Sequence, residues 1–386
     1  MKKRIYMDYA STTPVDPRVL KAMVPFFSKK YGNTMSLHSF GQEAKKALED
    51  AREKVARLMN AKSDKVVFTS SATEANNLAL KGVVFANRKK GKHIIVSAIE
   101  HPSVMESARW LEGLGFEVTY LPVDKFGLVD PAKLEKAIRK DTILVSIMHA
   151  NNEIGTIEPI EEIGKICREK GVYFHSDAAQ SYGKIPVDVE KMKIDLLTVS
   201  SHKMYGPKGA AALYINENVK IEPLLHGGGH EFGLRSSTVN VASVVGFGVA
   251  AEIAEREIEK EAEKLTRFRD KLIKGILEGI EKSYLNGHST KRLPNNVNLR
   301  FDYIEGESLV TFLDMYGVAA STGSACSTES MEPSHVLLAI GLTPYEAQSS
   351  LRLSLGRWTT KEEVNYVLKV LPKIVEKLRK IHPFKK

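Results

Sequence analysis

The feature that most constrains the fold is an alternation of short apolar runs with amphipathic segments over residues 66–215. The apolar runs, which predict strands, are residues 66–69, 93–99, 118–122, 142–149, 172–177, 195–199 and 210–215. The segments with helical periodicity are residues 73–87, 103–114, 131–139 and 160–170. The strands are continuously apolar, which is typical of a parallel or mixed sheet covered by helices on both faces. The sequence therefore predicts an α/β fold.

Polar side chains follow five of these predicted strands at the point where each strand ends. The polar clusters are centred on Thr73, His101, Asn152, Asp177 and Lys203. Ligands of such sheets bind beyond the carboxyl ends of the strands. We therefore expect these five residues to lie at one edge of the sheet and to form a binding site.

Two of these residues indicate the chemistry of the site. Lys203 lies in a turn between two apolar runs, where partial desolvation lowers the pKa of an amine and makes it a nucleophile. Asp177 ends an apolar strand, where a carboxylate needs a cationic partner. Considered alone, Lys203 would be interpreted as a solvated lysine in a surface turn, and Asp177 as a cap of the turn that follows it. Together they favour pyridoxal phosphate (PLP), which offers an aldehyde to the amine and a pyridinium to the carboxylate.

A phosphate site and an accessible thiol complete the candidate chemistry. Thr73 lies at a predicted helix N-terminus, where backbone N–H groups and the helix dipole favour a phosphate, and Ser71 is a candidate cap. Cys326 lies among small and polar residues in 321–328, which predicts a mobile loop with a reactive thiol. The alternative is a packed turn in which Cys326 is a bystander. Cys167 lies on a predicted helix and is interpreted as an inert packed side chain.

Composition excludes several other classes of protein. The 386 residues carry 56 basic and 47 acidic side chains, a net charge of +9, without the basic and aromatic array of a nucleic-acid-binding protein. With 2 cysteines no disulfide framework is expected, and no apolar stretch is long enough to span a membrane. The basic N-terminus lacks the apolar region of a signal peptide, so we expect a cytoplasmic protein. No metal site and no nucleotide loop are expected.

The charged helical stretch from residue 241 to about residue 282 predicts the change from one domain to the next. We expect a large domain over residues 15–258 and a smaller α+β domain formed by residues 1–14 and 259–386, which carries the Cys326 loop. Strands are expected near residues 284–286, 296–301 and 350–355. Helices are expected near residues 18–27, 41–59, 307–315, 334–340 and 361–380.

At this point the chain resembles a known family along essentially its whole length. The motifs that carry the resemblance are residues 8–14 (DYASTTP), 69–74 (TSSATE), 100–101 (EH), 151–155 (NNEIG), 177–181 (DAAQS), 201–209 (SHKMYGPKG), 227–231 (GGGHE), 235–238 (RSST), 323–326 (GSAC) and 350–356 (SLRLSLG). They are similar to those of the NifS/IscS group of cysteine desulfurases, which are class V, fold-type-I PLP enzymes. The resemblance implies a large domain with a mainly parallel seven-stranded sheet. Ser71, Ser201 and Ser237 replace glycines of many relatives without removing a catalytic group.

The resemblance also implies roles for individual residues around the cofactor. Lys203 would bind PLP as a Schiff base and move the Cα proton. Asp177 would pair with the pyridine nitrogen, Gln180 with the phenolic oxygen, and His101 would stack on the ring as a catalytic residue. Thr73, Ser200 and His202, beside Ala72, would hold the phosphate, with Thr238 reaching it from the other subunit of a homodimer.

For the substrate, the resemblance implies that Asn152, Arg352 and Asn33 bind the carboxylate of L-cysteine. Cys326 would accept the substrate sulfur as a persulfide, and the rest of the substrate would leave as L-alanine. The sulfur would then pass to an iron–sulfur scaffold or a tRNA-thiolation protein. Three alternatives stay open: a selenocysteine lyase, a class V aminotransferase with no use for Cys326, and a sulfur-relay protein without catalysis.

Overall fold

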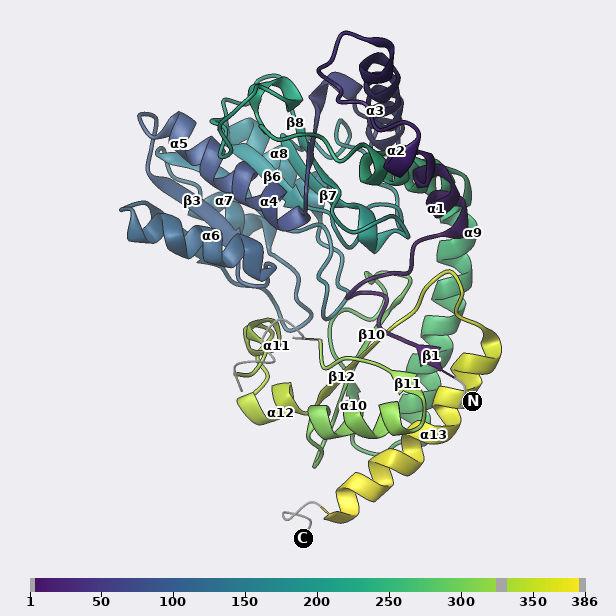
Figure 1. The fold of residues 1–386 in the computed structure, drawn as a ribbon. Coiled ribbons are helices and arrows are strands. Elements are labelled where there is room, and N and C mark those ends of the chain that lie inside the picture. The colour runs from purple at the N-terminus through teal and green to yellow at the C-terminus, as the bar shows by residue number, and fades with distance from the viewer. Residues whose placement is uncertain (1–3, 324–331, 382–386) are drawn as a thin grey trace.

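The computed structural model describes residues 4–323 and 332–381, and its central element is a seven-stranded sheet (Figure 1). The strands, in spatial order, are β2 (Val66–Thr69), β8 (Ala211–Ile215), β7 (Leu196–Ser200), β6 (Tyr173–Asp177), β5 (Thr142–Ser146), β3 (His93–Ser97) and β4 (Glu117–Leu121). Only β8 runs antiparallel to its neighbours, so the sheet is mainly parallel. The predicted α/β architecture is confirmed, and the seven predicted strands differ from these by at most three residues at either end.

Helices cover both faces of this sheet. One face packs against α4 (Ala72–Asn77), α5 (Val83–Asn87) and α6 (Pro102–Gly113). The other face packs against α1 (Pro17–Met23), α3 (Ser39–Arg57), α7 (Pro131–Ala137), α8 (Ile160–Lys170) and the first part of α9 (Val241–Gly279). Within β2, Val66 and Phe68 pack on the face that α3 and α8 cover, whereas Val67 packs on the face that α4 and α6 cover. Burial on both faces explains why the strands are continuously apolar.

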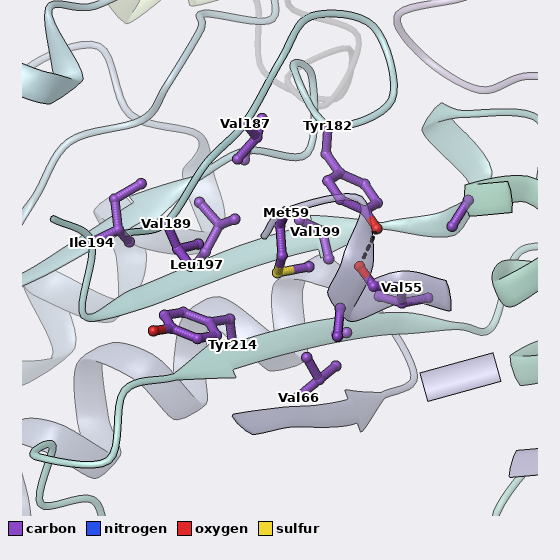
Figure 2. Close-up of a cluster of buried hydrophobic side chains, with 14 of the residues drawn as sticks. Val55, Met59, Val66, Tyr182, Val187, Val189, Ile194, Leu197, Val199 and Tyr214 are labelled. Carbon is purple, nitrogen blue, oxygen red and sulfur yellow. Dashed lines mark hydrogen bonds between the residues drawn. The ribbon is translucent and has the colours of Figure 1, made fainter. Parts of the chain in front are cut away.

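Figure 2 shows the part of the core between the sheet, α3 and the chain that follows β6. Tyr182 is fully buried there, and its hydroxyl donates to the carbonyl oxygen of Val55 at 2.7 Å. Met59, Leu197 and Tyr214 pack in the same cluster. This hydrogen bond satisfies the one polar atom of a large buried ring and ties the chain after Asp177 to α3.

A second core lies beside the other end of α9, which runs along one side of the molecule (Figure 1). Its three-stranded antiparallel sheet has the order β12 (Ser350–Ser354), β10 (Asn296–Phe301) and β9 (Ser283–Leu285). The helices α10 (Gly306–Met315) and α13 (Lys361–Ile381) pack in this core. The short helices α11 (His335–Ala339) and α12 (Pro344–Gln348) belong to a separate small cluster, which also contains Ile99, Met148 and Ile154. Buried residues of α9 up to Ala254 pack against the seven-stranded sheet, and those from Leu265 onward belong to the core of the three-stranded sheet. The domain boundary at residue 258 stays a prediction, which this change of core supports.

Two local expectations need correction, and one contact was not expected. The helix expected over residues 18–27 is divided into α1 and α2 (Pro25–Ser28), because Pro25 has no N–H to continue the α1 ladder. The helix expected over residues 73–87 contains a π-helical turn at Leu78–Gly82 between α4 and α5. In the structure β1 (Ile5–Tyr6) pairs in parallel with β11 (Val318–Ala319), a contact between distant segments that local patterns do not reveal.

Candidate active site

A cavity of about 380 Å³ lies at the carboxyl ends of the central strands. Ten of the predicted site residues line it: Ala72, Thr73, His101, Asn152, Asp177, Gln180, Ser200, His202, Lys203 and Arg352. Ala10, Ser11, Ser71, Met148, Ala150, Ala179 and Gly323 complete the lining. The five polar clusters that follow separate strands therefore do meet at one place.

Lys203 reaches the cavity from a short 3₁₀ turn (Ser201–Lys203) that directly follows β7. Its Nζ donates to the carbonyl oxygens of Ala10, at 2.6 Å, and Ser11, at 2.7 Å. The turn is tied to the same N-terminal segment, because Thr13 Oγ1 donates to the carbonyl oxygen of His202 and accepts from the backbone N–H of Tyr205. The amine is thus held by neutral acceptors at the cavity wall.

Asp177 ends β6 with its carboxylate at the cavity and only 4% of the residue exposed. Oδ2 accepts from the side-chain amide of Asn76 at 2.7 Å, and Oδ1 accepts from the backbone N–H of Ala179 at 2.9 Å. The same Asn76 amide donates to Ser103 Oγ, which lies 2.8 Å from His101 Nδ1. A continuous hydrogen-bonded chain therefore fixes Asp177 and His101 relative to each other.

The His101 ring is held where the sequence placed it, between β3 and α6. Nδ1 caps α6 by accepting the backbone N–H of Ser103 at 3.1 Å, so the neutral ring carries its proton on Nε2. Burial lowers the pKa of His101, against the opposing effect of the Asp177 carboxylate. A neutral imidazole is therefore the expected form at neutral pH.

The part of the cavity at the start of α4 is suited to an anion. Ser71 caps α4 by accepting the backbone N–H of Glu74, as expected, and Ala72 and Thr73 form the first turn of that helix at the cavity. His202 lies 3.1 Å from Thr12 Oγ1, and burial, followed by the charge of Lys203, lowers its pKa to about 4. Exposed N–H groups, hydroxyls and an imidazole at a helix start are the groups that bind phosphate.

Arg352 enters the cavity from β12, on the side of the three-stranded sheet, and its side chain is 3% exposed. Nη1 donates to the carbonyl oxygen of Asn152 at 2.9 Å. Nη2 donates to Asp8 Oδ1 at 2.9 Å and to Ser11 Oγ at 2.8 Å. A guanidinium fixed in this way presents a charge that suits a carboxylate ligand.

Three predicted residues do not join this lining. Asn33 and Thr238 are exposed and lie outside the cavity of a single chain. Cys326 lies outside the described residues, so the expectation for its loop stays a prediction. The side-chain amide of Gln180 donates to the carbonyl oxygen of Ala10 at 2.9 Å, and its predicted contact with the cofactor stays a prediction.

Sequence reasoning gave no role to several residues that build the site. Asn76 links Asp177 to Ser103, and the carbonyl oxygens of Ala10 and Ser11 bind Lys203. Residues 8–14 form one of the family motifs, but no local sequence pattern indicates which groups they contact. Asn76 lies four residues after Ala72 on the same helix, a spacing that places both on one side.

One buried carboxyl lies directly behind the cavity wall. Glu100 is fully buried, and its Oε1 accepts from Ser97 Oγ at 2.6 Å and from the backbone N–H of Met148 at 2.7 Å. Its Oε2 has no hydrogen-bond partner among the described residues. Burial raises the pKa of Glu100 to about 8. The Glu100 carboxyl, which precedes His101 in sequence, is therefore expected to be neutral or partly neutral at neutral pH.

Comparison with known proteins identifies the family. The Aminotransferase class-V family matches residues 5–367. The chain is 55% identical to the cysteine desulfurase IscS of Dictyoglomus turgidum, over 100% of this chain and 98% of the relative. It is 54% identical to the cysteine desulfurase IscS 1 of Archaeoglobus fulgidus, over 98% of each.

Solved structures agree with these sequence matches. A NifS-like protein is 41% identical with a TM-score of 0.91, over 97% of this chain and 99% of the other. A structure of SspA in complex with cysteine is 38% identical with a TM-score of 0.83, over 93% of this chain and 100% of the other. The chain belongs to the class-V aminotransferase family and, within it, to the cysteine desulfurases of the NifS/IscS group, as its motifs predicted.

Proposed function

We propose that this chain converts L-cysteine to L-alanine with PLP as cofactor and passes the sulfur to Cys326. The observation that carries the proposal is the meeting of an amine, a buried carboxylate and a guanidinium in one cavity, from Lys203, Asp177 and Arg352. Those three groups match the aldehyde, the pyridine nitrogen and the substrate carboxylate. Full-length similarity to cysteine desulfurases supports the choice of substrate.

The residues present fit PLP on the structure's own chemistry. Asp177 is almost buried, and its carboxylate accepts from the side-chain amide of Asn76 and the backbone N–H of Ala179. A protonated ring nitrogen is the kind of cationic partner that stabilises a carboxylate in such a place. Thr73, Ser200 and His202 would hold the phosphate. His101 would lie against the ring, and Lys203 would bind the cofactor covalently.

The chemistry that PLP supplies when bound is an electron sink for charge that develops at the substrate Cα. In our proposal Arg352 binds the substrate carboxylate and orients the Cα–H bond. Lys203 Nζ would take the Cα proton as general base, and Asp177 would hold the ring nitrogen of the cofactor in its protonated form. The hydrogen-bonded chain through Asn76 keeps Asp177 and His101 in place during these steps.

The sulfur transfer balances without a further oxidant. The Cys326 thiolate attacks the substrate sulfur, an S–S bond forms and the substrate C–S bond breaks. The carbon fragment takes up protons and leaves as L-alanine, and Cys326 is left as a persulfide. Transfer to an iron–sulfur scaffold or another acceptor would then regenerate the thiol. Cys326 lies outside the described residues, so this step rests on the family motif.

The decisive experiment measures alanine and sulfide release from L-cysteine by wild type and Cys326→Ala, both loaded with PLP. We expect activity in wild type and loss of about a hundredfold or more in the variant, since it lacks the nucleophile. Cys167→Ala is the matched control, because that thiol is buried and its pKa is raised by burial. Equal activity of wild type and Cys326→Ala would contradict sulfur transfer through Cys326 and favour a lyase.

We also propose a homodimer, because large apolar side chains are exposed close together in sequence near Asn33. They are Leu20, Val24, Phe27, Tyr31, Met35, Leu37 and Phe40, with Leu37 92% exposed. A surface of this kind usually marks an interface. Thr238 is also exposed, as the prediction that it serves the partner's phosphate site requires. Light scattering that found only the monomer mass would contradict the proposal.

The cellular location of the protein and the identity of its sulfur acceptor stay proposals. Among residues 4–323 and 332–381, no helix combines the length and apolar character that crossing a bilayer needs. We propose a cytoplasmic enzyme from its low cysteine content.

A further inference from the structure

The short turn formed by residues 8–11 contacts both cations of the cavity. Its carbonyl oxygens at Ala10 and Ser11 accept from Lys203 Nζ. Its side chains at Asp8 and Ser11 accept from Arg352 Nη2. One turn near the N-terminus therefore holds the proposed base and the proposed carboxylate-binding group at the same time.

Asp8 is placed against Arg352 by its own backbone. It forms a bridge with Ser354 at the end of β12, and its carbonyl oxygen accepts from the backbone N–H of Ser11 at 3.0 Å. Ser11 Oγ donates to Asp8 Oδ1 at 2.8 Å, the same oxygen that accepts from Arg352 Nη2. Ser11 lines the cavity, whereas Asp8 lies behind it. A ligand in the cavity can therefore contact Ser11 directly, whereas Asp8 acts on it through Arg352.

Asp8 is also the carboxylate that neutralises Arg352. Among the described residues it makes the one ion pair with that guanidinium, at 2.9 Å, with side-chain exposures of 3% for Arg352 and 19% for Asp8. Glu153 lies nearby, but burial raises its pKa and its Oε2 accepts from Ser334 Oγ at 2.6 Å. The other Arg352 contacts are with neutral oxygens, from Asn152, Gly323 and Ser11.

Two opposing effects on a ligand carboxylate follow from this arrangement. The hydrogen bond from Nη2 to Asp8 Oδ1 keeps the Arg352 guanidinium in one orientation, which reduces the entropy lost when a ligand binds. The negative charge of Asp8 also repels a second carboxylate at the same guanidinium, and in a largely buried place this repulsion is only weakly screened. An asparagine at this position would keep the shape and the acceptor oxygen but remove the charge, so the second effect can be measured alone.

We propose that Asp8 is a positioning residue for Arg352 that also limits its affinity for the substrate carboxylate. The inference rests on the proposed function, because it takes the ligand of Arg352 to be an amino-acid carboxylate. Each turnover leaves L-alanine with the same carboxylate as the substrate. A guanidinium that is already neutralised by Asp8 holds this product less tightly and releases it sooner.

The test is the variant Asp8→Asn, studied as holoenzyme. The probe is 3-mercaptopropionate, which has the carboxylate and thiol of cysteine but no amine, titrated by calorimetry. We expect about fivefold tighter binding to the variant, since loss of one such repulsion is worth a factor of this order. L-Alanine should inhibit turnover more strongly by a similar factor, and KM for L-cysteine should fall without a rise in kcat.

The matched control is Asp270→Asn. Asp270 makes the same kind of ion pair with Arg269 at 2.8 Å, but on α9 and away from the cavity lining. We expect its affinity for 3-mercaptopropionate to equal that of wild type. If Asp8→Asn does not yield folded protein, Asp8→Ser provides the same removal of charge.

The outcomes separate this inference from the proposed function. If a folded Asp8 variant binds 3-mercaptopropionate no more tightly than wild type, the inference is wrong and Asp8 acts only in packing. If wild type itself neither binds the probe nor forms alanine from L-cysteine, the proposed function has failed instead.

Discussion

The two sides of the cavity are built in different ways. On the side of the seven-stranded sheet, functional groups come from the ends of neighbouring strands and the helices that follow them, as with His101, Asp177 and Ser200. On the other side, Asp8 and Arg352 make a direct hydrogen bond although they are 344 residues apart in sequence. The first side follows from local topology, whereas the second depends on how two distant segments pack.

The sides also differ in what holds their functional side chains. Asp177 and His101 belong to one chain of hydrogen bonds through neutral side chains. Arg352 is instead held by an ion pair and by carbonyl oxygens. On the sheet side neutral side chains orient Asp177 and His101, whereas on the other side the carboxylate of Asp8 pairs with the Arg352 guanidinium. Substitutions on the two sides should affect different kinetic constants.

The largest effect is expected on the sheet side, from Lys203→Ala. Loss of the amine removes both the covalent attachment of the cofactor and the general base, so alanine formation from L-cysteine should fall by about a thousandfold or more. Lys208→Ala is the matched control, since Lys208 is an exposed lysine of the same segment. Comparable activity of wild type and Lys203→Ala would place the reacting amine elsewhere.

On the opposite side, Arg352→Ala should act mainly on substrate binding. The loss of a charged hydrogen-bond donor is expected to raise KM for L-cysteine by about ten- to a hundredfold, with a smaller change in kcat. Arg300→Ala is the control, because Arg300 lies on the neighbouring strand β10 and does not line the cavity. An unchanged KM in Arg352→Ala would show that the two sides do not divide the work in this way.

The smallest effect concerns stability and comes from Glu100→Gln. The pKa of Glu100 is raised to about 8 by burial, so between pH 4.5 and 8 the folded protein binds more protons than the unfolded chain. The unfolding free energy of wild type should therefore fall as pH rises through this window.

In Glu100→Gln this contribution disappears, and we expect greater stability than wild type at pH 8, by at least about 1 kcal/mol, with little difference at pH 4.5. Denaturant unfolding of both proteins at pH 4.5 and pH 8 measures this difference in unfolding free energy. Glu106→Gln, at an exposed position of α6, is the control. A variant that is less stable at pH 8 would mean that the charged carboxylate contributes to the sheet side.

Much of the sheet side could be read from the sequence for a physical reason. Strands buried on both faces are continuously apolar, and parallel strands bring their carboxyl ends to one edge. Asp177 and Lys203 could therefore be placed together from their positions after two apolar runs. Thr73 could be placed at a helix start because Ser71 has the chemistry of a cap.

What only the tertiary structure decided lies where contacts join distant segments. No local pattern states that β1 pairs with β11, that Ala10 and Ser11 bind Lys203, or that Asp8 faces Arg352. The sequence determined the strands, the reacting residue types and the family, because these depend on short-range periodicity and on motifs. The charge balance around Arg352 was decided by packing, since an ion pair exists only after both segments have folded against each other.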